Sequence, residues 1–481
     1  MADEHAQRDD GTPGAARLSL LDRVLRVFAD VRAGEGVTAA LLSFGLFLLL
    51  ASYYVIKPIR DSLITGLPKG AEYKSWMGAA IAIALLGAVP AYAKFASSVP
   101  RNKLLLWVTA FFVSNLVGFY LLGVLPFTGS GVGQLLYVLG FFLWVGVFNM
   151  MVIAQYWAFA NDIYTEEQGK RLFPLIGIGA SIGSAVGSMV LDTSIKQLKK
   201  SAEQEGRSGT AVIAPLLLLA AVILAASAVI ALWVHSRESR GGRAKPEEAK
   251  QDAPKEAESK EGAFRLVLSH RYLLLIALFS LVFTLVNTNS EFVKDVLVKA
   301  YAAELGGGDE AKTATIRTEL FNQFYLWVNL LGAFLQSFVV SRIVKFFGLR
   351  RAFFMLPFIA LLDATTIALL PVWGIVRFGK IAENATDYSL NNTLRNMLWL
   401  PTTRRMKYVA KQAVDTFFVR AGDVGSAALV FLFSDRLKLG VRAFAITNIA
   451  LIGVWLVLAR LIVVENDRMT KQGAIKQKTV T

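Results

Sequence analysis

The sequence predicts an all-α polytopic membrane protein with about twelve transmembrane helices in two six-helix halves. The first reason is composition: 55% of the 481 residues are hydrophobic and 18% are charged, whereas a soluble domain averages about 45–50% apolar and about 25% charged residues. The second is that many apolar runs exceed the roughly 18 residues that a transmembrane helix needs. The third is that these runs form two sets of six around a charged linker.

Residues 1–36 form a polar segment that ends in an amphipathic stretch. Apolar residues recur there at helical spacing between arginines, namely Leu18, Leu21, Leu25 and Phe28. Such a basic amphipathic helix is expected to lie on the anionic cytoplasmic leaflet of a membrane. Acidic residues near the start, such as Asp3 and Glu4, argue against a secretory signal peptide.

Two six-helix bundles are expected at 37–234 and 272–464, joined by a charged cytoplasmic linker at 235–268 and followed by a basic cytoplasmic tail at 465–481. The linker contains RGGRAKPEEAKQDAPKEAESKEG, which has almost nothing apolar to bury. The expected spans of the first bundle lie near 37–64, 77–97, 104–125, 132–160, 172–191 and 211–234. Those of the second lie near 272–294, 320–345, 349–371, 374–399, 412–434 and 441–464.

Local details indicate that the second bundle repeats the first. A basic turn follows both the second and the eighth span, with Arg101 and Lys103 in one and Arg350 and Arg351 in the other. The fifth and eleventh spans are both rich in small residues, which let helix backbones approach closely in lipid. Two such halves, related about an axis along the membrane normal, are the architecture of major-facilitator-type transporters. On this basis, the small-residue faces predict that the fifth span packs against the eighth and the eleventh against the second.

The positions of Lys and Arg predict the orientation. Loops after the even-numbered spans are basic, whereas the loops at 126–131 and 371–373 carry no Lys or Arg. Because basic loops stay in the cytoplasm, both termini are expected there. The longer loops near 192–210 and 295–319 are mixed in sign and weaken the rule locally. The same distribution accounts for the net charge of +15 without a nucleic-acid partner.

Several chemistries are excluded by what the sequence lacks. It has no cysteine, which removes disulfides, thiolate metal sites and cysteine nucleophiles, and its three histidines lie in polar flanks. It contains no GxxxxGK[ST] loop, which excludes Walker-type ATP hydrolysis. We therefore expect no enzymatic activity, no metal and no cofactor.

The tenth expected span carries polar residues along one helical face. The row consists of Lys380, Asn384, Asp387, Asn391 and Arg395. A charge inside a span costs about 2.5–3.5 kcal/mol and should therefore face a partner or a wet cavity. The row predicts a cavity lining, and the alternative is an amphipathic helix at the membrane interface.

The first expected span continues past its apolar core into Lys57, Arg60 and Asp61, where Pro58 can kink the helix. These charges either face a central cavity or snorkel at the outer interface, with Asp61 as the partner of the basic residues. Cations in a central cavity suit an anionic substrate. Acidic residues there would balance the cations or couple protons.

Three segments are more specific than composition. The first is WAFANDIYTEEQGKRLFPLIGIGA at 157–180, and the third is Lys57…Arg60-Asp61-x-Leu63. The second runs from Tyr388-Ser389-Leu390 through Met397 and Pro401 to Lys407 and Lys411-Gln412-Ala413-Val414-Asp415. Together they resemble the bacterial and plastid ATP/ADP translocases, also called nucleotide transporters or ADP,ATP carriers. The resemblance covers about residues 37–464 and is that of a divergent bacterial member.

That family exchanges nucleotides across membranes, usually external ATP for internal ADP, without hydrolysing them. The resemblance implies that Lys57 and Arg60 occupy two basic positions of its first helix, that Asp61 matches directly, and that Asp162 stands at an acidic position before the loop between helices four and five. The candidate substrate-binding residues are therefore Lys57, Arg60, Asp61, Asp162, Lys380, Asn384, Asp387, Asn391 and Arg395. The candidate gating or loop residues are Glu166, Lys170, Arg171, Lys407, Lys411 and Asp415.

Two departures from the family pattern fall where substrate selection is expected. Asn396 stands in place of a carboxylate in helix ten, and Asp423 in place of a basic residue in helix eleven. The retained features predict exchange of nucleotides, or of a related phosphorylated anion, by alternating access around a midplane site.

The protein is expected to be a multi-pass monomer of a bacterial inner membrane, with the bilayer and the substrate as its partners. One alternative is proton-coupled transport of another solute, in which Asp61, Asp387, Asp415 or Asp423 would titrate. A second alternative is a non-transporting receptor on the same fold.

Overall fold

The computed structural model describes residues 19–99, 101–124, 131–164, 166–205, 215–240, 263–403, 406 and 410–478. Within these ranges the chain is helical and contains no strand. The predictions made for residues 1–18, for Lys407 and for most of the 235–268 linker lie outside the described residues.

Six long helices make up the first half, and each overlaps one of the expected spans. They are α2 (Gly36–Gly66), α3 (Gly70–Ser98), α4 (Arg101–Gly123), α5 (Gly131–Ile163), α6 (Glu166–Glu205) and α8 (Pro215–Arg240). A short helix, α1 (Leu20–Leu25), precedes them. Pro58 lies inside α2 and does not end it.

The second half also follows its six expected spans, but π-helical turns divide several of them. Its elements are α9 (Ala263–Ser269), α10 (Arg271–Gly306), α11 (Glu310–Phe334), η3 (Leu335–Val339), α12 (Val340–Ala352), α13 (Met355–Leu369), α14 (Trp373–Thr386), η4 (Asp387–Asn391), α15 (Asn392–Met397), α16 (Lys411–Ala413), η6 (Val414–Phe418), α17 (Val419–Val430), η7 (Phe431–Arg436) and α18 (Val441–Lys478). Gly348, at φ 64°, breaks α12. Glycine adopts a positive φ more readily than other residues. The break at Gly348 separates the eighth span from the ninth.

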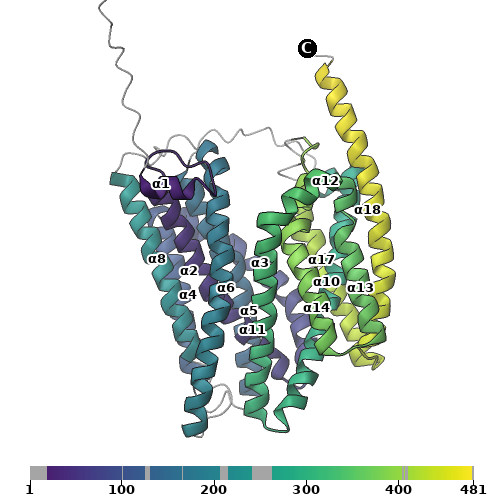
Figure 1. Cartoon of the computed structure of the whole chain (residues 1–481). Coiled ribbons are helices and arrows are strands. Elements are labelled where there is room, and N and C mark those ends of the chain that lie inside the picture. The colour runs from purple at the N-terminus through teal and green to yellow at the C-terminus, as the bar shows by residue number, and fades with distance from the viewer. Residues whose placement is uncertain are drawn as a thin grey trace, which may run out of the picture.

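The helices have the length and composition of a membrane protein. Among the described residues, eight helices are long and apolar enough to cross a membrane, and Met355–Leu369 is a shorter apolar helix. Figure 1 shows the long helices running side by side, with α1 and the C-terminal end of α18 at the same end of the bundle. We call this the terminal end, and the opposite one the distal end.

The two halves meet through the helix pairs that the repeat predicted. α6 packs against α11 and α3 packs against α17, which confirms the expected contacts of the fifth span with the eighth and of the second with the eleventh. The small-residue run of the fifth span takes part in its contact, since Asn322 of α11 donates to the carbonyl oxygen of Ser188 at 2.9 Å. Several glycines of the two runs pack inside their own half instead. A Cβ atom added to Gly183 would lie 2.2 Å from the carbonyl oxygen of Phe47 in α2, and one added to Gly422 would lie 2.7 Å from that of Leu281 in α10.

The apolar core joins the halves on the distal side. One cluster of buried residues combines Ile56 and Phe148 of the first half with Phe292 and Phe324 of the second. A separate cluster, which includes Trp455, lies within the second half. Burial of apolar surface therefore holds the halves together on the distal side.

The N-terminal segment is anchored at the terminal end by a buried carboxylate. Asp22 of α1 accepts hydrogen bonds from the backbone N–H groups of Ser19 at 2.9 Å and Gly36 at 2.9 Å, and it is 1% exposed. Burial alone would raise the pKa of Asp22, but the hydrogen bonds from Ser19, Gly34 and Gly36 outweigh it and lower this pKa. α1 ends at Leu25, which is shorter than the amphipathic repeat suggested.

Candidate functional site

A continuous chain of ion pairs crosses between the halves on the distal side. Arg60 donates to Asp61 at 2.8 Å, and Lys74 of α3 lies 3.3 Å from the same carboxylate. Lys74 also pairs with Asp295 of α10 at 2.9 Å, so one lysine joins the two halves. Tyr325 of α11 donates its hydroxyl to Asp61 as a second bridge. The Asp61 carboxylate, which is fully buried, thus has three donors.

The chain continues through the second half. Lys294 Nζ lies 3.5 Å from Asp295 and 2.5 Å from Glu291. Glu291 also accepts a hydrogen bond from Asn384 at 3.0 Å and lies 3.5 Å from Lys380 Nζ. Lys294 and Lys380 are fully buried. Buried amines of this kind are stable only while their carboxylate partners stay in place.

Lys380 and Glu383 form the last pair of the chain, with Nζ and Oε2 3.0 Å apart. Lys380 also donates to Ser290 Oγ at 3.1 Å. We call the whole series the charge chain. Its members are Arg60, Asp61, Lys74, Asp295, Lys294, Glu291, Lys380 and Glu383. The charge chain contains equal numbers of basic and acidic residues, so its formal net charge is zero.

Further polar contacts join the halves nearer the distal end. They are Lys69 with Asp435 at 2.6 Å, Ser434 donating to Glu72 at 2.7 Å, and Lys299 donating to the carbonyl oxygen of Pro68 at 2.9 Å. The hydrogen bond that the Lys69 amine donates to Asp435 raises the pKa of Lys69, and burial has little effect on this pKa. Together with the charge chain, these contacts close the bundle on the distal side.

Lys57 lies one helical turn before Asp61 and is surrounded by aromatic rings. Its Nζ is 4.0 Å from the ring centre of Tyr325 and 5.4 Å from that of Tyr54. Among the described residues, no carboxylate lies within ion-pair distance of Lys57. A cation over an aromatic face gains about 0.5–2 kcal/mol. Lys57 therefore adds an amine that no carboxylate of the charge chain pairs with.

A cavity of about 480 Å³ lies on the terminal side, lined mainly by the second half and by one residue of the first. Met150 of α5 lines it from the first half, and Arg395, Lys411, Asp415 and Arg420 line it from the second. Its ion pairs are looser than those of the charge chain, since Arg395 and Asp415 are 3.6 Å apart and partly exposed. The volume is in the usual range of small-molecule sites.

The predicted polar row of the tenth span is divided by η4. Lys380 and Asn384, before the π-helical turn, join the charge chain. Asn391 donates to Asp387 at 2.7 Å within the turn. Arg395, after the turn, lines the terminal cavity. The row thus serves two regions of the molecule instead of one midplane site.

The predicted loop residues gather at the terminal end. Asp162 is partly exposed near the end of α5, whereas Asp61 comes 25 residues after the start of α2, or about 37 Å along that helix. The structure therefore does not bring Asp162 to the charge chain. Arg171 pairs with Glu35 at 2.9 Å. Lys411 lies 3.9 Å from Asp415. The side chains of Glu166 and Lys170 lie outside the described residues.

Sequence reasoning missed Lys74 and Asp295, the pair that joins the charge chain across the two halves. Lys74 was placed in a loop because the second span was expected to start at residue 77, but α3 begins at Gly70. Glu291, Lys294 and Asp295 share one helical face at spacings of three and four residues. Glu291 and Lys294 fell at the polar end of the expected seventh span, 272–294, whereas Asp295 fell outside it because α10 continues to Gly306.

The fold and the site together define a membrane transporter with two helical halves, which are joined on the distal side by buried ion pairs. A solved POT family transporter in complex with 5-aminolevulinic acid is similar, with a TM-score of 0.58 and 13% identity over 90% of this chain and 96% of that chain. The nucleoside transporter NupG is similar with a TM-score of 0.55 and 13% identity, over 89% of this chain and 98% of that chain. These likenesses show a major-facilitator-like fold.

The chain belongs to the TLC ATP/ADP transporter family, whose model matches residues 122–465. The ADP,ATP carrier protein 1 of Chlamydia pneumoniae is 22% identical over 360 residues, which cover 69% of this chain and 67% of the relative. The protein of the same name from Chlamydia trachomatis is 21% identical over 65% of this chain and 62% of the relative. The matches thus span about two thirds of these relatives. They confirm the family resemblance expected from the sequence.

Proposed function

We propose that this transporter exchanges nucleotides, or a related phosphorylated anion, across a bacterial inner membrane by alternating access and without a catalytic step. Family membership and the names of the relatives support the nucleotide class. The observation that carries the proposal is the Lys57 amine, which has no carboxylate partner among the described residues and lies beside tyrosine rings next to the charge chain. Such an amine is available to a phosphate oxygen.

In this proposal the anion enters through the terminal cavity. It first meets Arg395 and Arg420, whose partners are partly exposed, and then Lys57. A phosphate group there would compete with Asp61 for Arg60 and Lys74. The guanidinium of Arg60 offers phosphate oxygens a planar fork, and lysines offer point charges. The rings of Tyr54 and Tyr325 offer faces on which a base can stack.

Exchange, as opposed to one-way flux, would follow from the cost of opening the distal side. Opening would separate Lys74 of the first half, which is 12% exposed, from Asp295 of the second, which is 2% exposed. A buried charge that loses its partner costs about 3–5 kcal/mol. A bound phosphate would supply the missing negative charge. An empty transporter would therefore stay closed, and a loaded one would open.

The test is counter-exchange in proteoliposomes. Vesicles preloaded with ADP and offered labelled ATP should take up label, whereas empty vesicles should not. A panel of other phosphorylated anions, offered in the same way, would define the substrate. Uptake of nucleotide that does not depend on internal nucleotide would contradict exchange, and absence of uptake with every phosphorylated anion would contradict the substrate class.

The proposal includes the orientation and the moving parts. Bundles 37–234 and 272–464 would rock about the site as units, with the linker 235–268 and both termini in the cytoplasm. A protease added to inverted membrane vesicles should then cut the linker. Protection of the linker in inverted vesicles, together with cleavage in right-side-out cells, would reverse the orientation.

Proton-coupled transport of another solute is a second candidate. It is favoured by Asp363 of α13, a residue missed in the sequence, which is 2% exposed and lies beside Glu383 at the end of the charge chain. A pair of buried carboxylates is an arrangement that can carry a proton. Uptake driven by a pH gradient and lost in Asp363→Asn would favour this candidate over exchange.

A further inference from the structure

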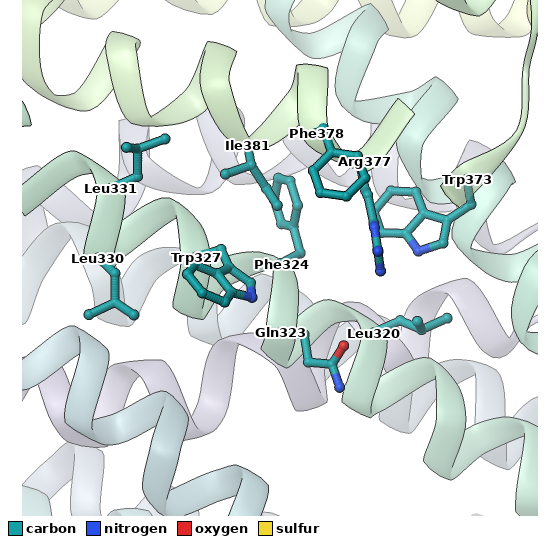
Figure 2. A pocket seen from close by; sticks show the side chains of 10 residues that line it. All are labelled: Leu320, Gln323, Phe324, Trp327, Leu330, Leu331, Trp373, Arg377, Phe378 and Ile381. Atoms are coloured by element: carbon teal, nitrogen blue, oxygen red, sulfur yellow. The ribbon is translucent and has the colours of Figure 1, made fainter. Parts of the chain in front are cut away.

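A groove of about 530 Å³ lies between α11 and α14, apart from the terminal cavity. Both walls belong to the second half, so the groove does not open and close with the contact between the halves. Figure 2 shows its lining, which includes Gln323, Trp327 and Leu331 of α11 and Trp373, Arg377 and Phe378 of α14.

The distal end of the groove is polar. Trp373 is the first residue of α14 and Arg377 follows one turn later. In Figure 2 the Arg377 side chain extends from α14 toward α11, on which Gln323 lies. Arg377 makes no ion pair with any described residue and rests 4.7 Å from the ring centre of Phe378. The indole N–H of Trp373 is buried and has no hydrogen-bond partner in the part of the chain that the structure describes, and the residue is only 4% exposed.

The rest of the groove is apolar. Trp327, Leu330 and Leu331 line it from α11, and Ile381 faces them from α14. The lining of α11 runs from Leu320 to Leu331, or about 16 Å along the helix. The rings on its rim are exposed, Trp327 to 58% and Phe378 to 62%. Exposed apolar rings at the depth of transmembrane helices face lipid.

We propose that this groove binds one phospholipid, with the headgroup phosphate at Arg377 and an acyl chain along Trp327, Leu331 and Ile381. Three features match this occupant. The unpaired guanidinium complements a phosphate, the unsatisfied indole N–H of Trp373 offers a second donor at the same end, and the polarity falls toward the middle of the helices as it does along a lipid of the distal leaflet.

The lipid would lie behind one wall of the charge chain. Phe324 lines the groove and its ring centre is 6.3 Å from that of Trp373. The same Phe324 ring lies 4.7 Å from Nζ of Lys294, a member of the charge chain. An occupied groove therefore supports a ring that packs directly against a buried cation.

Native mass spectrometry of the full-length protein, delipidated and then incubated with phosphatidylglycerol or diacylglycerol, tests the proposal. The wild type should retain phosphatidylglycerol and not diacylglycerol. Arg377→Gln should retain at least about tenfold less, since a charge-assisted contact is worth about 1.5–3 kcal/mol. Arg377→Lys should recover part of the retention. Ile381→Trp should abolish it by filling the groove without changing its charge.

Arg436→Gln is the matched control. Arg436 also lies near the distal end and rests over a neighbouring ring, 5.2 Å from the centre of Phe431, but it does not line the groove. This variant should retain lipid as the wild type does. Equal retention by Arg377→Gln and Arg436→Gln would overturn the phosphate contact. Equal retention by Ile381→Trp and the wild type would overturn the groove as the site, and equal retention of diacylglycerol would overturn the phospholipid.

Discussion

The distal and terminal sides of the bundle use the same kinds of charged residues in opposite ways. In the charge chain, Asp61, Lys294 and Lys380 are fully buried. In the terminal cavity, the side chains of Arg395 and Asp415 are 26% and 46% exposed. Breaking a buried pair costs about 3–5 kcal/mol, whereas an exposed pair contributes about 0–1 kcal/mol. In the proposed mechanism, the distal side would hold the halves closed, and the terminal side would be the entrance for the substrate.

The largest effect is expected for Asp61→Asn, which removes the negative charge shared by Arg60, Lys74 and Tyr325. Two buried cations would lose a partner, at a cost of about 3–5 kcal/mol, and the distal closure should loosen. Because the chain has no cysteine, Leu67→Cys can report on it. Leu67 is 4% exposed in the closed state, and a membrane-impermeant maleimide should label it faster in the Asp61→Asn background.

Asp415→Asn in the same Leu67→Cys background is the control, since this carboxylate is exposed on the other side. It should leave the labelling rate near that of the parent. Equal labelling in both backgrounds, for folded protein, would remove the distinction between the two sides.

The next effect is expected for Arg60→Ala. If Arg60 holds a substrate phosphate, binding should weaken by roughly 1.5–3 kcal/mol, the range for hydrogen bonds to charged groups, or about 10–100-fold. Arg60→Lys should restore part of it, because the charge remains while the fork is lost. The measurement is transport per folded molecule. Normal specific activity in Arg60→Ala, with a lower melting temperature, would leave Arg60 with the structural task of pairing Asp61.

A smaller effect is expected for Arg395→Ala at the entrance. Its pair with Asp415 is long and partly exposed, so loss of stability should stay below about 1 kcal/mol. Uptake at low substrate concentration should fall several-fold, because the cavity loses one cation, and saturating substrate should restore it. Arg350→Ala, which removes an exposed pair with Asp467 elsewhere, should change neither. A loss as large as that of Arg60→Ala would assign Arg395 to the binding site itself.

The smallest effect concerns pH at the terminal end. Hydrogen bonds lower the pKa of Asp22 in the folded state. Its contribution is therefore fully present above the ordinary pKa of aspartate, about 3.9, and is lost as the pH falls through the lower folded value. Hydrogen exchange of residues 19–36 should be slow at neutral pH and rise only in strong acid. Asp22→Asn should show fast exchange at every pH, and a wild-type profile in this variant would exclude the anchoring role.

The positions of the helices were predictable from sequence because apolar length is a local property. The pairing of α6 with α11 and of α3 with α17 followed from the repeat, since two like halves have few ways to meet. The charge chain was not predictable as a whole. Lys74 and Asp295 lie 221 positions apart, and the residues around each of them give no signal that the two form a pair. Arg60 next to Asp61 was the visible part of a network that depends on the docking of the two halves.

The separation of Lys380 from Arg395 shows a second limit. Helical spacing put both on one face, but η4 accommodates an extra residue between them. A π-helical turn of this kind shifts the register by about one residue, or about 100° of rotation. The spacing of polar residues does not reveal a turn of this kind.

The π-helical turn η4 also gives the tenth span a point about which its two segments could rotate relative to each other. If η4 rewound to an ordinary α-helical turn, the segment after it would rotate by about 100° relative to the segment before it. Arg395 would then turn relative to the cavity while Lys380 kept its carboxylate partners. A change confined to η4 would in this way reorient Arg395 at the terminal cavity and leave the ion pairs of the charge chain unchanged.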